Sequence, residues 1–229
     1  MVRLREHRRR RTTVLSVERR PVFVPGGVIV AGGRSTRFGE RDKAVADLAG
    51  VPMIRRVADR LSGVVDQLVV NCRADQRAAI DDALSGYDAP VGFAIDDDPD
   101  QGPMAGIGQG LSRVDADAYA FVVACDMPLV DPDFVAYLFE RAAGRDGAVA
   151  QLDDKWFQTT HAVYRAGPMA AACEAALARD DRKIMAPLGD LNYAVVDEAE
   201  VQEHAALGPE VFENINTEAE LEAVAERFF

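Results

Sequence analysis

The sequence predicts a three-layer α/β fold, in which a mainly parallel, Rossmann-like sheet is flanked by helices. Short valine-rich segments alternate with amphipathic segments of helical length, which is the pattern of right-handed βαβ units. Residues 119–125 form an almost continuous apolar run, as expected of a strand that is buried on both faces of a parallel sheet. A chain of 229 residues is long enough for one such domain with a substantial core.

The first half of the chain has the more regular pattern. A strand at 28–30 runs into a glycine-rich loop, and a helix over 52–61 is marked by Pro52 in its first turn and Gly63 past its end. Further strands are predicted at 64–71, 91–95 and 119–125, and further helices at 75–84, 102–113 and 132–143.

The second half is less regular. We predict strands at 148–151, 157–164 and 193–196, and helices at 168–178 and at the C-terminus. The last helix begins at a capping box formed by Thr217 and Glu220, and it places Leu221, Val224 and Phe228 on one face.

Charge divides the chain into a basic arm and an acidic body. Eight of the 26 basic residues but only two of the 38 acidic ones lie in residues 1–25, which leaves 18 basic and 36 acidic side chains, a net charge of −18, for residues 26–229. The arm is expected to be disordered, or to reflect a start codon placed too early. It does not resemble a secretory signal, because the apolar stretch that such a signal contains does not follow it. The acidic body argues against nucleic acid as its partner and suggests adaptation to a salty cytoplasm.

Two further patterns limit the class of protein. No run of about 18 apolar residues exists, so no membrane span is predicted. The cysteines, Cys72, Cys125 and Cys173, are odd in number and widely spaced, which indicates neither a zinc site nor a disulfide framework. A reducing cytoplasm is the expected location.

The glycine-rich loop after the first strand is the most informative segment. Residues 28–43 read VIVAGGRSTRFGERDK, which brings backbone amides and cations together, as phosphate groups require. The spacing fits neither G-x-G-x-x-G nor the P-loop, and this argues against a Rossmann oxidoreductase. A glycine-rich turn without function is the alternative.

Polar residues also follow the other predicted strands. Asn71 ends the second strand, Asp96 and Asp97 follow the third, and Asp126 follows the buried strand at 119–125. Ligands of open α/β sheets bind beyond the carboxyl ends of the strands, so these side chains are expected to converge. A carboxylate at Asp126 can hold Mg²⁺ against a triphosphate, although a helix cap or a turn would also explain an aspartate there.

Lys43 ends the glycine loop and is one of only three lysines in a chain with 23 arginines. A compact ammonium group can follow phosphate oxygens through a transition state, and Arg37 could act similarly. The alternative for both residues is a solvated surface side chain.

The loop resembles the signature of the molybdopterin nucleotidyltransferases of the molybdenum cofactor guanylyltransferase type, roughly L-A-G-G-x-S-x-R-M-G-x-D-K. The matching residues are Ala31, Gly32, Gly33, Ser35, Arg37, Gly39, Asp42 and Lys43. Phe38 replaces the methionine, and one residue is inserted before Asp42. Further similar segments lie at 102–106, 125–128, 158–165, 182–185 and 214–217, so that the resemblance covers about residues 26–227, with Thr159 where a proline is common.

The resemblance implies a nucleotide-diphospho-sugar-transferase-like fold and a Mg²⁺-dependent enzyme. Such an enzyme transfers GMP from GTP to the terminal phosphate of molybdopterin (molybdenum cofactor) and releases pyrophosphate. Residues 26–145 would bind the nucleotide and residues 146–229 the acceptor. Other proteins of molybdenum cofactor biosynthesis, or the enzymes that accept the cofactor, are candidate partners.

The resemblance also implies roles for individual residues. Lys43, Asp126 and Arg37 would be catalytic, and Asp126 would hold the metal. The nucleotide would be bound by Val30, Ala31, Gly32, Gly33, Lys43, Asn71, Asp97 and Asp126, with Asp96 as the alternative to Asp97. The acceptor would be bound by Gly102, Arg182, Lys183, Asn214 and Asn216. The alternative for Arg182 and Lys183 is a salt-bridged helix start, and the alternative for Asn214 and Asn216 is the turn before the last helix.

Three other functions remain open at this point. The enzyme could use CTP, or it could transfer a nucleotide to a sugar phosphate or another small phosphate. A protein that binds nucleotides without turnover is a different class, and the presence of both Lys43 and Asp126 argues against it.

Overall fold

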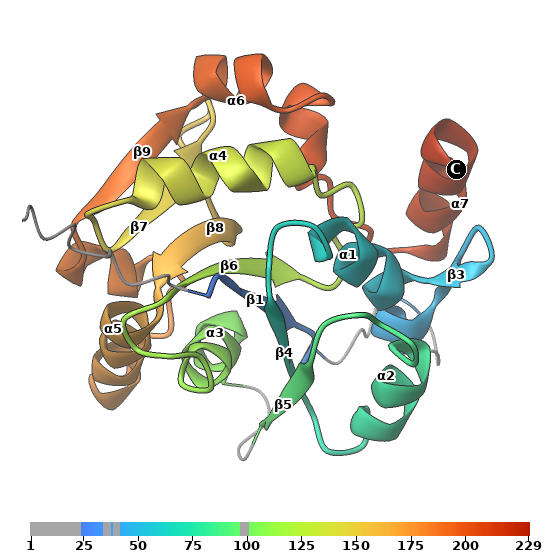
Figure 1. Cartoon of the computed structure of the whole chain (residues 1–229), viewed down its shortest axis with the longest axis horizontal. Coiled ribbons are helices and arrows are strands. Elements are labelled where there is room, and N and C mark those ends of the chain that lie inside the picture. Colours follow the sequence, from blue (N-terminus) through green and yellow to red (C-terminus); the bar gives the residue numbers. More distant parts are fainter. Residues whose placement is uncertain (1–23, 34–37, 39–41, 97–100) are drawn as a thin grey trace, which may run out of the picture.

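The computed structural model of the chain describes residues 24–33, 38, 42–96 and 101–229. The predictions for the arm at 1–23, for Arg37 and for Asp97 lie outside these residues. Within the described residues, seven strands form one sheet in the order β5-β4-β1-β6-β8-β7-β9. Helices cover both faces of this sheet (Figure 1), which confirms the predicted three-layer α/β fold.

Four neighbouring strands of the sheet are parallel: β5 (Val91–Ile95), β4 (Gln67–Cys72), β1 (Gly26–Val30) and β6 (Tyr119–Ala124). In their register, Val30 lies opposite both Asn71 and Ala124, and Asn71 lies opposite Ala94. The carboxyl ends of all four strands therefore meet at one edge of the sheet.

The two faces of the sheet bury separate apolar cores, because side chains alternate along each strand. Ile29 and Phe121 belong to the core under α1 (Met53–Leu61), α4 (Pro132–Ala142) and α6 (Glu198–His204), which also includes Ile80 of α2 (Arg77–Ala83). Val28 and Val122 face α3 (Pro103–Leu111) and α5 (Ala166–Ala178) on the other side. None of the described helices is both long and apolar enough to cross a membrane.

The second half of the chain extends the same sheet with a change of direction. β8 (Phe157–Arg165) is antiparallel to both β6 and β7 (Gly147–Gln151), and β9 (Tyr193–Asp197) runs parallel to β7. Val149 lies opposite Ala162, but Gln151 lies opposite Phe157, so β8 contains a bulge between these two positions. Bulges often lie beside active sites, where they change the direction of a side chain.

The last helix, α7 (Glu218–Phe228), contacts the short hairpin of β2 (Asp47–Leu48) and β3 (Val51–Pro52), as Figure 1 shows. A third apolar cluster joins these segments and includes Phe38, Leu48, Ile215 and Val224. Because of this packing, residues 214–217 at the start of α7 lie near the first loop of the chain.

Most predicted elements are present, but their ends differ. β4 begins at Gln67 instead of residue 64, and α2 begins at Arg77 instead of residue 75. The sequence prediction missed the β2–β3 hairpin, α6 and three 3₁₀ helices, η1 (Lys43–Val45), η2 (Ala186–Asp190) and η3 (Gly208–Phe212). These are short elements, and their apolar patterns are too brief to distinguish them from loops.

Candidate active site

A cavity of about 490 Å³ lies at the carboxyl ends of the parallel strands. It is lined by Val30, Ala31, Gly32, Gly33, Lys43, Asn71, Asp96, Gln101, Gly102, Pro103, Ala105, Ala124, Cys125, Asp126, Thr160 and Asn216. The structure therefore brings together the predicted nucleotide-binding residues that it describes, together with Asp96, Gly102 and Asn216. The convergence follows from the parallel register, which places each of the strand ends at the same edge.

The two adjacent glycines of the first loop differ in their surroundings. A Cβ atom on Gly32 would lie 2.2 Å from Oδ2 of Asp96, so no side chain fits there without displacing that carboxylate. A Cβ atom on Gly33 would meet no heavy atom of the described residues within 4 Å. A side chain at position 32 would therefore clash with Asp96, whereas one at position 33 would clash with none of the described residues.

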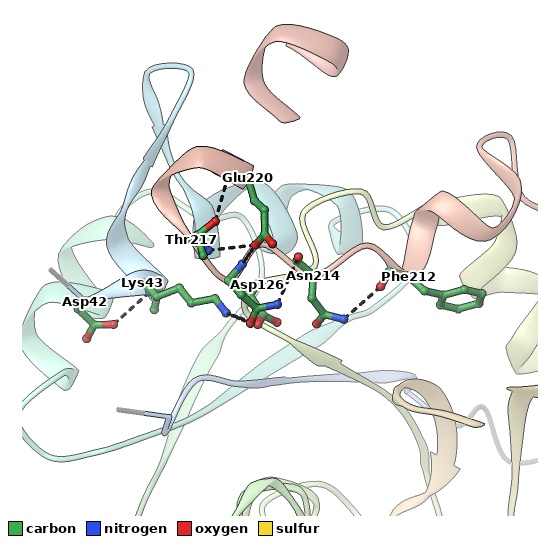
Figure 2. Close-up of polar contacts among 9 residues, drawn as sticks. Asp42, Lys43, Asp126, Phe212, Asn214, Thr217 and Glu220 are labelled. Atoms are coloured by element: carbon green, nitrogen blue, oxygen red, sulfur yellow. Dashed lines mark hydrogen bonds and ion pairs between the residues drawn. The ribbon is translucent and has the colours of Figure 1, made fainter. Parts of the chain in front are cut away.

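Lys43 and Asp126 form the centre of the site (Figure 2). Lys43 opens η1, which is capped by Asp42, whose Oδ1 accepts from the backbone N–H of Ala44 at 3.0 Å. The Lys43 ammonium forms an ion pair with Oδ2 of Asp126 and donates to Oδ1 of Asn216 at 3.0 Å. Both side chains of the ion pair are mostly buried, with exposed fractions of 11% and 16%.

The second carboxylate oxygen of Asp126 has a different environment. Oδ1 is buried and has no hydrogen-bond partner among the described residues. A buried carboxylate oxygen without a partner is costly, so this oxygen is available to a ligand, an ion or water.

The segment before α7 is held against Asp126 by the backbone. The N–H of Ile215 donates to the carbonyl of Asp126 at 2.9 Å. At the next two residues, the N–H groups of Asn216 and Thr217 donate to Oε2 of Glu220 at 2.6 and 3.0 Å, which completes the predicted capping box. The N–H of Asn216 is the main reason that the pKa of Glu220 is lowered. The cap of α7 thus fixes Asn216 beside Lys43.

A second polar cluster lies under the glycine loop. Asn71 is fully buried, and its Nδ2 donates to Oδ1 of Asp96 at 2.6 Å and to the carbonyl of Ala94 at 3.2 Å. With its amide oriented to satisfy its neighbours, Gln109 of α3 also donates to Oδ1 of Asp96, at 3.0 Å. A Cβ atom on Gly106 would lie 2.3 Å from Oδ1 of Asn71, so this glycine makes room for the amide.

Sequence reasoning missed Gln109, and it preferred Asp97, which lies outside the described residues, to Asp96. The signal for Asp96 was its position directly after β5. Gln109 lies in the last turn of α3, where a glutamine usually faces solvent, so no local pattern identifies it.

The residues predicted at the acceptor are dispersed. Gly102 lines the cavity and has a φ of 85°, a conformation that favours glycine. Arg182 is exposed, pairs with Asp180 at 3.0 Å and does not line the cavity, and neither does the neighbouring Lys183. The amide of Asn214 donates to the carbonyl of Phe212 at 3.3 Å, which leaves Asn216 as the amide of this segment that lines the cavity. Their role at the acceptor stays a prediction.

The cysteine that lines the cavity and the nearby buried histidine are poorly suited to act as nucleophile or base. Burial raises the pKa of the Cys125 thiol far above its ordinary value, so this thiol stays protonated. His161, next to Thr160 on β8, packs against Phe121, Phe134 and Phe212, and burial lowers its pKa to about 3. Both groups are neutral near pH 7, so the cysteine is not a thiolate nucleophile and the histidine is not a charged acid there.

The described residues include no group of three or more histidine, cysteine, aspartate or glutamate side chains that could hold a metal ion. The two carboxylates that line the cavity, Asp96 and Asp126, suit a different mode of metal binding. Mg²⁺ is commonly held by one or two carboxylates, with the remaining positions taken by substrate phosphates and water.

An open, mainly parallel sheet with a glycine loop, a lysine and a carboxylate at the strand ends is the architecture of a nucleotidyltransferase. The chain belongs to the MobA-like NTP transferase domain family, whose model matches residues 27–194. This match confirms the family that the sequence motifs indicated.

Relatives with similar sequences cover nearly the whole domain. A protein of Natronomonas pharaonis described as a probable molybdenum cofactor guanylyltransferase is 51% identical, over 88% of this chain and 96% of the relative. A protein of Haloferax mediterranei with the same description is 41% identical, over 88% and 93%. The crystal structure of molybdopterin-guanine dinucleotide biosynthesis protein A from Archaeoglobus fulgidus matches with a TM-score of 0.71 and 26% identity, over 88% and 97% of the two chains.

Proposed function

We propose that this chain is a molybdenum cofactor guanylyltransferase, which transfers GMP from GTP to the terminal phosphate of molybdopterin. The products are molybdopterin guanine dinucleotide and pyrophosphate. The observation that carries the proposal is the Lys43–Asp126 pair, which lies at the strand ends beside the glycine loop of a MobA-like domain.

The acceptor does not need a general base in this reaction. A phosphate monoester is already an anion near pH 7, so its oxygen can attack the α-phosphorus of GTP without losing a proton first. The new P–O bond forms as the bond between the α-phosphorus and the pyrophosphate oxygen breaks. A site whose buried thiol and imidazole stay neutral suits this chemistry.

The main task of the protein is then to align the two phosphates and to balance their negative charge. Lys43 provides a fixed ammonium group, which Asp126 and Asn216 hold in place. We infer that this ammonium group contacts phosphate oxygens of the bound nucleotide, because it is the cation that lines the described cavity. Arg37, outside the described residues, remains a second candidate for this role.

Asp126 fits the metal ion that such a reaction uses. Its buried Oδ1 has no partner among the described residues, while Oδ2 is bound by Lys43. We propose that Asp126 holds Mg²⁺ through Oδ1, with phosphate oxygens and water as the other ligands. When bound, the metal ion would neutralise charge on the phosphates and on the departing pyrophosphate.

The cluster of Asn71, Asp96 and Gln109 is our candidate for the nucleoside end of the site. A carboxylate only accepts hydrogen bonds, and guanosine offers donors on both its base and its ribose. Two hydrogen bonds to its Oδ1 hold Asp96 in place under the loop. We propose that Asp96, rather than Asp97, contacts the nucleoside.

The second half of the domain, residues 146–229, is proposed to bind molybdopterin. Thr160 and Asn216 of this half line the cavity, as does Gly102 of the first half. Arg182, Lys183 and Asn214 are further candidates that do not line it. The described cysteines are free and buried, which suits the reducing cytoplasm where we propose that the enzyme works.

Product analysis by mass spectrometry tests the proposal. The purified protein, in high KCl with Mg²⁺, is given molybdopterin and equal amounts of GTP and CTP. We expect a guanine dinucleotide that is absent with Asp126→Ala and unchanged with Asp133→Ala, an exposed aspartate in the first turn of α4. A cytosine dinucleotide would contradict the choice of base, and the absence of any dinucleotide despite tight nucleotide binding would contradict the reaction.

A further inference from the structure

The glycine loop can bind phosphate only if its carbonyl groups point away from the ligand. Carbonyls that point away from the ligand can accept hydrogen bonds from the rest of the protein. Three successive carbonyls of the loop accept such hydrogen bonds, all from the turn between β4 and α2. The side chain of Gln76 donates to the carbonyl of Ala31 at 3.0 Å, and Nη1 of Arg73 donates to those of Gly33 and Gly32 at 2.6 and 3.3 Å.

Arg73 and Gln76 are themselves held in place. Asp75 accepts from Nε and Nη2 of Arg73 at 3.1 and 3.2 Å, which makes the pair bidentate and fixes the plane of the guanidinium. The side-chain oxygen of Gln76 accepts from the backbone N–H of Arg73 at 2.9 Å. Gln76 is only 2% exposed, and the Arg73 side chain is 17% exposed.

Neither of these residues lines the cavity. They contact the outer side of a loop whose inner side, from Val30 to Gly33, does line it. The backbone N–H of Ala31 donates to the carbonyl of Asn71 at 2.8 Å, so the start of the loop is also tied to β4. Both ends of this loop segment are therefore fixed from the β4–α2 side.

We infer that Arg73 and Gln76 are positioning residues that hold the Ala31–Gly33 backbone in the conformation that binds the triphosphate. By occupying the carbonyls, they keep this segment from rotating these acceptors toward a polyanion, and residues 31–33 are held in place before the ligand arrives. This role rests on the proposed function in one respect only, namely that the ligand of the site is a nucleoside triphosphate.

A direct role for the Arg73 charge is the competing explanation. The Arg73→Lys variant separates the two, because lysine keeps the positive charge but lacks the planar fork that spans two carbonyls and Asp75. If Arg73 acts through loop geometry, lysine is a poor replacement. If it acts as a phosphate-binding cation, lysine restores most of the affinity.

Calorimetric titration measures the binding of Mg·GTP, GMP and guanosine to the full chain and its variants. We expect Arg73→Ala and Arg73→Lys to weaken Mg·GTP binding about tenfold to a hundredfold, the effect of losing hydrogen bonds of this kind. Guanosine binding should change less than about twofold, because the nucleoside does not use the loop carbonyls. Arg77→Ala is the matched control, since Arg77, at the start of α2, lies over the ring of Phe93 of β5.

Gln76→Glu adds a second variant at the buried position. It keeps the shape and the acceptor for the N–H of Arg73 but loses the donor to Ala31, so Mg·GTP should again be weakened more than guanosine. Because this substitution could unfold the protein, circular dichroism accompanies it, and Asp75→Asn, at an exposed aspartate, provides a milder change with about a twofold to fivefold loss.

Unchanged Mg·GTP binding in Arg73→Ala, or full recovery in Arg73→Lys, would overturn the inference. Equal losses for Mg·GTP and guanosine would also overturn it, because they indicate general damage to the site. The proposed function is tested separately. Wild-type protein that forms no guanine dinucleotide, but binds Mg·GTP in an Arg73-dependent way, would refute that function and leave the positioning role intact.

Discussion

The two walls of the cavity come from different parts of the chain and are built by different means. The first wall consists of residues at the ends of parallel strands β1, β4, β5 and β6, whose positions follow directly from the sheet register. The second wall includes Thr160, from a bulged antiparallel strand, and Asn216, from the cap of α7. The first wall depends on local sequence, whereas the second depends on contacts between distant segments.

This difference fits the two substrates that we propose. A triphosphate needs fixed amides and cations, which strand ends and tight loops supply. We propose that the second wall, which includes Thr160 and Asn216, faces the acceptor. We therefore expect substitutions in the first wall to have the larger effects on nucleotide binding and transfer.

The largest effect is expected for Lys43→Ala. Removing a fixed cation from the phosphates should lower kcat for dinucleotide formation by about 100- to 1,000-fold. Lys155→Ala, in the turn before β8, is the control with the same loss of charge. Activity within tenfold of wild type, with a normal circular dichroism spectrum, would show that the lysine is not part of the chemistry.

Gly32→Ala tests the geometry of the first wall. The added methyl group would lie 2.2 Å from Oδ2 of Asp96, so the loop or the carboxylate must move, and we expect Mg·GTP to bind at least about tenfold more weakly. Gly33→Ala is the matched control, because a Cβ atom there meets no atom of the described residues within 4 Å. Similar affinities for the two variants in calorimetric titration would contradict this description of the loop.

Asn216→Ala tests the second wall. It removes the 3.0 Å hydrogen bond to the Lys43 ammonium, and a bond to a charged group is typically worth about 1.5–3 kcal/mol, so kcat should fall about tenfold or somewhat more. Nucleotide affinity should fall less than kcat. Steady-state kinetics measure both, and Asn214→Ala, whose amide faces the carbonyl of Phe212, should have the smaller effect. The reverse order would move the site to Asn214.

His161 affects stability rather than activity. Its pKa is about 3 in the folded protein and about 6.5 when exposed, so between these values the unfolded state binds a proton that the folded state does not. Stability should therefore fall as pH is lowered from about 6.5 toward 3, by about 2 kcal/mol at pH 5. Urea unfolding measures the free energy of unfolding at pH 7 and at pH 5. Between these two pH values, the loss should be about 2 kcal/mol smaller for His161→Met than for wild type. An equal loss in both proteins would contradict the shift.

Much of the first wall could be predicted from sequence because each of its residues directly follows an apolar run. Asp126 after 119–125 and Asn71 at the end of a valine-rich segment are recognisable without any alignment. The run of three aspartates after β5 left the choice between Asp96 and Asp97 open, since one residue of register separates them. The structure places Asp96 in the cavity.

Other residues could not have been found this way. Gln109 contacts Asp96, and Arg73 contacts the carbonyls of Gly32 and Gly33, about 40 residues earlier in the chain. Neither residue belongs to a recognisable motif, and both are of types that usually face solvent. The placement of Asn216 depends on α7 docking against the β2–β3 hairpin, and two strands of two residues each have too short a pattern to predict. Long-range packing, rather than local propensity, decides these positions.

Following the fate of the phosphates of GTP tests the central claim most directly. Wild-type protein, Lys43→Ala and Asp126→Ala are each incubated with molybdopterin, Mg²⁺ and GTP that is radioactively labelled in either the α- or the γ-phosphate. We predict that wild type transfers the α label to the dinucleotide and releases the γ label as pyrophosphate, and that both variants lose both signals together. Transfer of the γ label to the acceptor, or α transfer that survives in the two variants, would contradict the account.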